Sequence, residues 1–361
     1  MGQMVTTGYL STFKGRRVFI TGHTGFKGSW LAFLLKEVGA EVLGYALPPI
    51  GKKNHFDLLG LAQMIGHVEA DIRDAEKLTA IMTGFQPEFV FHLAAQALVR
   101  PSYNDPKTTF ETNVMGSVNL LEAVRKCESV RSLVYITSDK CYENLEWLWG
   151  YRENDRLGGH DPYSASKSSA EMVFSAYVRS FFFDRSDLGM ASTRAGNVIG
   201  GGDWAVDRII PDCIRAIESE KLIYLRNPLA TRPWQHVLEP LSGYLLLAAQ
   251  LRKEPSAYAG SWNFGPSSKE ARTVLEVAEY LVARFGRGGI NSEASMEKHH
   301  EARLLQLNCD KAHQVLGWYP RWDFERTLNM TSDWYKQIHA GVEAKEVTLQ
   351  QVHDYFPEIG R

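Results

Sequence analysis

Short apolar runs alternate with amphipathic stretches through the first half of the chain, and this alternation restricts the possible folds more than any other feature. Each apolar run has the length of a buried strand, and the stretches between runs can form helices. Strands joined by helices lie parallel in one sheet, so the sequence predicts an α/β fold with a doubly wound, mostly parallel sheet. The expected strands cover residues 17–21, 41–45, 67–69, 89–93, 132–136 and 190–194.

The second half of the chain is less regular. A turn-rich stretch at 200–203 precedes apolar helices that we expect near 241–251 and 274–285. Open α/β sheets bind ligands outside the carboxyl ends of their strands. We therefore expect this half to form a smaller lobe that closes over that edge.

Composition argues against several classes of protein. The 361 residues suffice for one large domain or two closely joined domains. A net charge of −2 does not indicate a surface for nucleic acid or membrane, and no apolar run approaches the roughly 20 residues of a membrane helix. Cys127, Cys141, Cys213 and Cys309 are scattered, which favours free thiols in a reducing cytoplasm over disulfides or a zinc site.

A glycine-rich segment at 21–28 (TGHTGFKG) joins the first expected strand to the first expected helix. Glycines let the backbone turn tightly and approach a diphosphate, and the helix N-terminus attracts its negative charge. The segment predicts a dinucleotide site, although an ordinary glycine-rich turn would look the same. Its candidate cofactor-binding residues are Gly22, Thr24, Gly25, Phe26, Lys27 and Gly28.

Asp71 follows the third expected strand and is a candidate acceptor for an adenine amino group, with Ile72 beside it. A helix N-cap is a nearly equal alternative for Asp71. The second expected strand ends without the acid that selects NAD and without an arginine for the extra phosphate of NADP, although Lys52 and Lys53 lie just beyond. The sequence leaves the choice between NAD and NADP open.

Tyr163 and Lys167 are four residues apart on an expected helix, so both side chains share one face. A nearby ammonium favours the phenolate and is expected to lower the pKa of Tyr163 from about 10 toward neutrality. Tyr163 would then take a proton from a substrate hydroxyl while a hydride leaves the carbon. The pair is common on helices, and it gains weight from its place after the glycine loop and the fifth strand.

Ser138, Asp139 and Lys140 follow the fifth expected strand, at the same edge of the sheet. The serine hydroxyl can bond the oxygen that Tyr163 deprotonates, a protonated aspartic acid can donate to a leaving hydroxyl, and a neutral lysine can take a proton from carbon beside a ketone. Such a site can oxidise a substrate, eliminate water from it and then reduce the product of the elimination. The alternative is a turn with a surface ion pair.

Together these residues resemble the extended short-chain dehydrogenase/reductase superfamily and, within it, the CDP-glucose 4,6-dehydratases. The resemblance extends from about residue 17 to residue 320. dTDP-glucose dehydratases carry Asp-Glu where this chain has Asp139-Lys140, and UDP-sugar epimerases usually lack both groups. The supporting segments are the glycine loop, HLAAQ at 92–96, NVMG at 113–116, ITSDKCY at 136–142, YSASK at 163–167, RAGNVIGGGDW at 194–204 and TRPWQHVL at 231–238.

The resemblance implies a Rossmann-like dinucleotide-binding domain at 1–196 and a lobe at 197–361 that mainly binds a nucleotide sugar. A segment near 232–251 is expected to return to the first domain. Implied cofactor-binding residues beyond the glycine loop are Asp71, Ile72, Leu93, Ala94, Ala95, Gln96, Asn113, Thr137, Tyr163 and Lys167. Implied substrate-binding residues are Ser138, Asn197, Arg208, Arg232 and Arg303.

The resemblance also implies the reaction. CDP-glucose would be oxidised at C4 with NAD, lose water across C5 and C6, and be reduced at C6 to CDP-4-keto-6-deoxyglucose. The catalytic residues would be Ser138, Asp139, Lys140, Tyr163 and Lys167, with Lys140 as base at C5 and Asp139 as acid at the C6 hydroxyl. NAD would be tightly bound and regenerated in each turnover, and no metal is expected.

Two other functions remain open at this point. A nucleotide-sugar epimerase or dehydrogenase would use Tyr163 and Lys167 without exchanging the C5 proton, and a non-catalytic dinucleotide sensor is a more distant alternative. The family resemblance further implies a cytoplasmic homodimer, or a dimer of dimers, in deoxysugar and O-antigen biosynthesis. The apolar dimer face, alternatively ordinary core, would comprise Leu120, Leu121, Val124, Val173, Phe174, Tyr177 and residues 181–183.

Overall fold

The computed structural model describes residues 8–267, 271–291 and 304–359. Its centre is a seven-stranded sheet with the order β11-β6-β5-β4-β1-β2-β3, in which every neighbouring pair is parallel. This sheet confirms the predicted α/β fold, and each expected strand is present. The strands are β1 (Arg17–Thr21), β2 (Glu41–Ala46), β3 (Gly66–Glu69), β4 (Phe89–His92), β5 (Ser132–Ile136), β6 (Gly189–Ala195) and β11 (Gly260–Phe264).

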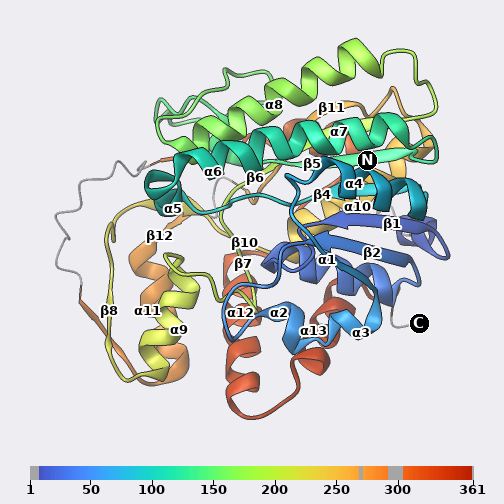
Figure 1. The fold of residues 1–361 in the computed structure, drawn as a ribbon. Coiled ribbons are helices and arrows are strands. Elements are labelled where there is room, and N and C mark those ends of the chain that lie inside the picture. The colour runs from blue at the N-terminus through green and yellow to red at the C-terminus, as the bar shows by residue number, and fades with distance from the viewer. Residues whose placement is uncertain (1–7, 268–270, 292–303, 360–361) are drawn as a thin grey trace.

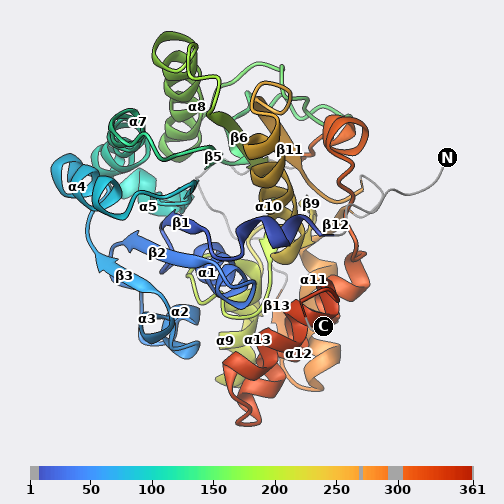
Figure 2. The ribbon, with the colours of Figure 1, turned by 90° about the vertical axis from the view of Figure 1, so that its right-hand side faces the viewer.

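Helices cover both faces of the sheet, as Figures 1 and 2 show. Alternate residues of a strand face opposite sides, so Val18 and Ile20 pack on the core beneath α1 and α10, while Phe19 packs on the core beneath α4, α7 and α8. The helices of this half are α1 (Phe26–Glu37), α2 (His55–Leu58), α3 (Leu61–Met64), α4 (Ala75–Phe85), α5 (Val99–Asn104), α6 (Pro106–Phe110), α7 (Gly116–Lys126) and α8 (Pro162–Phe181).

The chain returns to the sheet after leaving it. Helix α10 (Leu238–Lys253) is almost entirely buried and packs against β5 and β6, and β11 then pairs with β6 at the edge of the sheet. The sequence predicts that a segment near residues 232–251 returns to the first domain. It does not predict β11, which is the seventh strand of the sheet. The division of the chain into two domains stays a prediction.

The strands and helices given in this paragraph, here called the smaller lobe, lie mostly in the lower half of Figure 1, where α2 and α3 also lie. Three two-stranded sheets pair β7 with β10, β8 with β13 and β9 with β12. The strands are β7 (Val198–Ile199), β8 (Leu222–Tyr224), β9 (Thr231–Pro233), β10 (Gln235–His236), β12 (Ala271–Thr273) and β13 (Gly289–Asn291). The helices are α9 (Ile209–Glu218), α11 (Val274–Phe285), α12 (Phe324–His339) and α13 (Ala344–Tyr355).

Among the described residues, no helix is long and apolar enough to cross a membrane, and no group of three or more His, Cys, Asp or Glu side chains is arranged to hold a metal. All four cysteines are buried free thiols.

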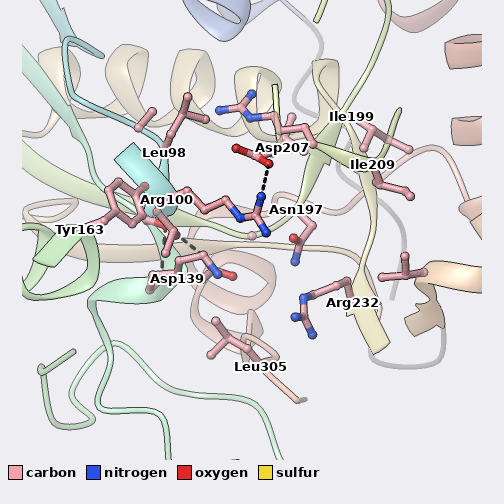
Figure 3. A pocket seen from close by; sticks show the side chains of 18 of the residues that line it. Leu98, Arg100, Asp139, Tyr163, Asn197, Ile199, Asp207, Ile209, Arg232 and Leu305 are labelled. Carbon is pink, nitrogen blue, oxygen red and sulfur yellow. Dashed lines mark hydrogen bonds and ion pairs between the residues drawn. The ribbon is translucent and has the colours of Figure 1, made fainter. Parts of the chain in front are cut away.

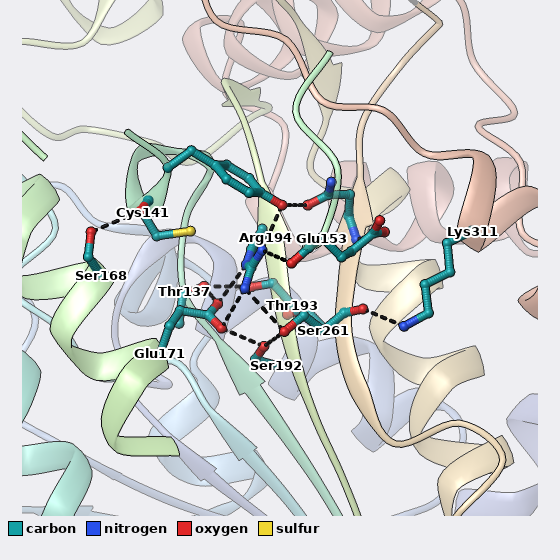
Figure 4. Close-up of polar contacts among 12 residues, drawn as sticks. Thr137, Cys141, Glu153, Ser168, Glu171, Ser192, Thr193, Arg194, Ser261 and Lys311 are labelled. Carbon is teal, nitrogen blue, oxygen red and sulfur yellow. Dashed lines mark hydrogen bonds and ion pairs between the residues drawn. The ribbon is translucent and has the colours of Figure 1, made fainter. Parts of the chain in front are cut away.

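A buried ion pair joins α8 to the sheet (Figure 4). Arg194 on β6 makes a bidentate contact with Glu171 on α8, with both nitrogen–oxygen distances at 2.9 Å and both side chains at most 3% exposed. The Thr137 and Ser192 hydroxyls donate to the same carboxylate. Burial alone would raise the pKa of Glu171, but the hydrogen bonds and charge of Arg194 outweigh it and lower that pKa.

We predict that Glu171→Gln lowers the free energy of unfolding by about 3–5 kcal/mol, because Arg194 is left as a buried charge without its counter-ion. Because the pKa of Glu171 is lowered, its stabilising contribution is present at neutral pH and is lost as the pH falls through the folded-state pKa, so the variant should lack this part of the acid sensitivity. Urea denaturation at several pH values measures both effects. Asp333→Asn, which breaks a surface pair with Arg284, is the control and should change stability by less than ~1 kcal/mol. Equal losses in the two variants would contradict the prediction.

Candidate active site

A cavity of about 390 Å³ lies at the carboxyl ends of the strands, between the sheet and the smaller lobe (Figure 3). This is the edge at which open α/β sheets bind ligands. The residues that line it include seven of the predicted catalytic and substrate-binding residues: Ser138, Asp139, Lys140, Tyr163, Asn197, Arg208 and Arg232.

The first turn of α8 positions Tyr163. Asp161 caps the helix by accepting the Ser164 backbone N–H at 2.9 Å, and Pro162 occupies the first helical position, where a missing N–H costs nothing. The Tyr163 backbone N–H donates to Ser102 Oγ of α5 at 3.2 Å. The phenol is thereby presented to the cavity from a fixed helix end.

The electrostatics of Tyr163 correct the prediction from sequence. Burial raises the pKa of Tyr163 to about 12, although a hydrogen bond with Ser138 lowers it. Burial lowers the pKa of Lys167 to about 8, and the charge of Glu171 opposes this. The predicted fall of the Tyr163 pKa toward neutrality is therefore wrong for this structure, because removing a phenolate from water costs more than its neighbours return.

Two residues after the end of β5, Ser138 caps a short 3-10 helix, η3 (Asp139–Cys141), which begins at Asp139. The Ser138 hydroxyl donates to Asp139 Oδ1 at 2.9 Å, and the Asp139 side chain is buried. Gly196 leaves room for this carboxylate, since a Cβ at residue 196 would lie 2.8 Å from Asp139 Oδ2. Asp139 and Tyr163 thus meet in one cavity and both contact Ser138.

Two lysines line this cavity. Lys140 is half-buried beside Asp139, as its place in the sequence requires. Lys27 reaches the cavity from the first turn of α1, although sequence analysis assigned it to the cofactor loop. Burial, followed by the positive charge of Arg208, lowers the pKa of Lys27 to about 8.

The glycine loop turns as tightly as its sequence predicts. Gly22 has φ +77°, and a Cβ there would lie 2.6 Å from the backbone nitrogen of Ala94. A Cβ at Gly28 would lie 2.1 Å from the carbonyl oxygen of Gly22, so α1 can pack on the loop only with glycine. The N-cap of α1 is Gly25, which provides no side-chain cap, so the helix end suits a diphosphate.

On the adenine side of the predicted cofactor site, the structure contradicts the helix N-cap alternative for Asp71, and a contact of Asp71 with adenine stays a prediction. Asp74, not Asp71, is the N-cap of α4. Asp71 instead accepts bonds from the backbone and guanidinium of Arg73, whose hydrogen bonds lower the pKa of Asp71. Ile72 is buried beneath it. The Thr24 hydroxyl of the glycine loop donates to the carbonyl oxygen of Leu47, the residue after β2, at 2.9 Å.

Other predicted cofactor residues take part in structural contacts. Asn113 clamps the loop after β4, because its side chain accepts the Gln96 backbone N–H at 2.8 Å and donates to the Gln96 carbonyl at 3.0 Å. The Gln96 amide donates to Thr109 at 3.0 Å, and the Thr137 hydroxyl is bonded to Glu171. Leu93, Ala94, Ala95 and Phe26 are partly buried around the same loop. Cofactor contacts by these residues stay predictions.

The predicted substrate-binding residues have different partners. Arg208 donates to Asp203 Oδ2 at 2.9 Å, and the charge of Asp203 raises the pKa of Arg208. Arg232 is 5% exposed and donates to the Thr231 carbonyl at 2.9 Å. Arg303 lies outside the described residues.

The sequence does not predict a cluster of three charged residues in the cavity. Arg100, Asp207 and Arg226 line it, and both arginines bond to Asp207 Oδ1, Arg100 at 2.9 Å and Arg226 at 3.1 Å. Their positions in the sequence are far apart and follow no motif. The lone signal was the adjacent Asp207-Arg208 at the start of a helix, which is also common on surfaces.

Comparison with known proteins finds relatives over nearly the whole chain. The GDP-mannose 4,6 dehydratase family model matches residues 19–331. A CDP-glucose 4,6-dehydratase of Salmonella typhimurium is 48% identical over 358 residues, covering 97% of this chain and 98% of the relative. A dTDP-glucose 4,6-dehydratase of Streptomyces antibioticus is 27% identical, with 90% of this chain and 93% of the relative covered.

Solved structures share the fold. A dTDP-glucose 4,6-dehydratase of Streptomyces venezuelae, solved with NAD, has a TM-score of 0.76 at 24% identity over 91% of this chain and 99% of that chain. A UDP-glucose 4-epimerase of Thermus thermophilus, in complex with NAD, has a TM-score of 0.76 at 26% identity over 89% and 99%. With its family model across most of the sequence and a relative of nearly half-identical sequence over the same length, the chain belongs to the GDP-mannose 4,6-dehydratase family of extended short-chain dehydrogenases/reductases.

Proposed function

We propose that this chain is a CDP-glucose 4,6-dehydratase, a lyase that forms CDP-4-keto-6-deoxyglucose. The observation that carries the proposal is the cavity itself, in which Asp139 and Lys140 accompany Ser138 and Tyr163. Oxidation alone needs the tyrosine and the serine. An acid and an amine beside them add the proton donor and the base that an elimination requires. The 48% identical CDP-glucose 4,6-dehydratase supports the same substrate.

NAD is the proposed cofactor, since solved relatives of the same fold contain it. The tight loop at Gly22 and Gly28 and the α1 N-terminus without a side-chain cap fit its diphosphate. When bound, NAD would supply the hydride chemistry at C4 and C6 and a positively charged ring that favours the Tyr163 phenolate. Tight binding and regeneration within each turnover belong to the proposal.

The side chains of the cavity then act in sequence. Tyr163 takes the proton of the C4 hydroxyl, and Ser138 donates a hydrogen bond to the same oxygen. The C4 ketone makes the C5 proton acidic, Lys140 removes it, and Asp139 protonates the C6 hydroxyl as it leaves. Lys167, buried behind Tyr163, provides the positive charge that supports the phenolate.

The substrate diphosphate would lie near Asn197, Arg208 and Arg232, because arginine forks suit phosphate oxygens. Arg303 remains a further candidate. We place the enzyme in the cytoplasm, where its four free cysteines stay reduced, and in deoxysugar synthesis for O-antigen.

The proposed homodimer uses only part of the face that the sequence predicts, the exposed Phe181. Leu120, Leu121, Val124 and Phe174 are buried in the core of their own chain. Large apolar side chains that remain exposed on the same stretch of helices are better candidates for an interface. They are Phe110, Met115, Met172 and Phe181, between 38% and 57% exposed.

We expect the purified protein to convert CDP-glucose in deuterated water to a product with a new C6 methyl group and deuterium at C5. Elimination exposes C5 to solvent before it is reprotonated, so the label is specific to this reaction. Proton NMR with CDP-, dTDP-, UDP- and GDP-glucose measures both the reaction and the nucleotide. A methyl from another nucleotide would contradict the cytosine preference alone. If none of the four nucleotide sugars gives a methyl group in the presence of NAD, the proposed dehydratase activity would be contradicted, and an epimerase or a sensor would be favoured.

Lys140→Ala should still oxidise C4 but should lose exchange of the C5 proton, because the base is gone while Tyr163 is intact. Reduced nicotinamide should accumulate, as its absorbance would show, and deuterium should not enter C5. Lys140→Arg keeps the charge without a usable base and serves as the matched control that should fail in the same way. Wild-type turnover by either variant would remove Lys140 from the role of base.

Tyr163→Phe should stop the first oxidation, with a loss of at least about 100-fold, because no other group takes the proton of the C4 hydroxyl. Single-turnover formation of reduced nicotinamide measures this step separately from elimination. Circular dichroism should show an unchanged fold. Normal formation of reduced nicotinamide by this variant would show that another group deprotonates C4–OH.

A further inference from the structure

Asp207 lies in the cavity between two arginines from distant parts of the chain. Its Oδ1 accepts Nη1 of Arg100 at 2.9 Å and Nη1 of Arg226 at 3.1 Å, and its backbone carbonyl accepts Nη2 of Arg226 at 3.2 Å. All three residues line the cavity, and each side chain is about one-third exposed. Figure 3 shows Arg100 extended across the cavity toward Asp207.

The three residues belong to elements that otherwise lie apart. Arg100 is on α5, where Ser102 also accepts the backbone N–H of Tyr163. Asp207 is in the loop before α9, and Arg226 follows β8. The cluster therefore joins the smaller lobe to the segment that supports the proposed catalytic tyrosine.

The backbone at Asp207 is held in an unusual conformation. Its φ of +62° is left-handed, a conformation that is unfavourable for residues other than glycine, although Asp and Asn tolerate it better than most. Strained residues of this kind persist where their surroundings fix them, often at functional sites. The same loop also places Asp203 against Arg208 at 2.9 Å. One loop thus supplies two carboxylates that each hold arginine in the cavity.

The charges of the cluster favour an anion. Two guanidinium groups share one carboxylate, so the three side chains together carry one positive charge. Arginines that are already held in place lose less conformational entropy when they bind phosphate oxygens. A diphosphate bears two negative charges, and it must lie in this cavity if the hexose is to reach Tyr163.

We propose that Asp207 is a positioning residue that presents Arg100 and Arg226 to the diphosphate of the nucleotide sugar. The inference rests on the proposed function, because it takes a nucleoside-diphosphate sugar as substrate. It adds two arginines to the substrate-binding residues and assigns a role to a carboxylate that would otherwise repel the substrate.

The test is Asp207→Asn, which keeps the size of the side chain and its tolerance of a left-handed backbone but removes the charge. Its Kd for CDP, measured by calorimetry, and its KM for CDP-glucose should both rise about tenfold, while kcat changes by less than about threefold, because both arginines lose their fixed geometry and Tyr163 does not. Unchanged or tighter CDP binding would overturn the proposal, and tighter binding would mean that Asp207 competes with the diphosphate for the arginines.

A double-mutant comparison separates positioning from direct contact. If Asp207 acts through the arginines, adding Asp207→Asn to an Arg100→Gln/Arg226→Gln background should weaken CDP binding no further. A further tenfold loss there would show that Asp207 acts by itself and would overturn the proposal.

Asp212→Asn is the matched control. Asp212 lines the same cavity and interacts electrostatically with Arg226, but its hydrogen bond is to Arg215, which does not line the cavity, so CDP binding should change by no more than about twofold. An equal loss in this variant would overturn the proposal, since any lost carboxylate would then have the same effect. Wild-type protein that binds CDP without dehydrating CDP-glucose would contradict the proposed function alone, whereas normal turnover with unaltered binding by Asp207→Asn would contradict this inference alone.

Discussion

The bidentate pair between Glu171 and Arg194 is the contact on which the arrangement of the active site depends. Helix α8 carries Tyr163 and Lys167 two turns and one turn before Glu171, so the pair fixes how far along its axis the helix sits against β5 and β6. Ser138 follows Thr137, whose hydroxyl is bonded to the same carboxylate. One buried charge pair thus sets the positions of both segments that face the reacting carbon atoms.

Burial that holds these residues in place also sets their protonation. Burial raises the pKa of Tyr163 to about 12 and lowers the pKa of Lys167 to about 8, so it disfavours the phenolate strongly while Lys167 stays mostly charged at neutral pH. The proposed reaction then needs a charge that arrives with the cofactor before proton transfer becomes favourable. Proton transfer by Tyr163 would therefore become favourable only when the cofactor is bound.

The sequence predicts the fold well where local patterns decide it. Apolar runs identified most of the strands because buried parallel strands are nearly continuous in hydrophobicity, although β3 is partly exposed and has one large apolar residue, Val68. Strand β11 has only Trp262 and Phe264 as large apolar residues, and its pairing with β6 depends on the tertiary structure. The motifs likewise predict that Ser138, Asp139, Lys140 and Tyr163 lie at one edge of the sheet, and all four line the cavity. The motifs do not reveal the burial that governs the pKa of Tyr163. Nor could it join Arg100 to Asp207, because contacts between distant loops leave no periodic trace in a sequence.

The position of β11 has a consequence for how this protein is made. Six strands of the sheet are complete by residue 195, but the seventh begins at residue 260, and the buried helix α10 that covers β5 and β6 precedes it. Until a ribosome has released about three-quarters of the chain, β6 is an unprotected edge strand above an exposed apolar face. Nascent chains of this protein should therefore be good substrates for chaperones that bind during translation, and a stop codon placed between β6 and β11 should yield an aggregating fragment rather than a free nucleotide-binding module.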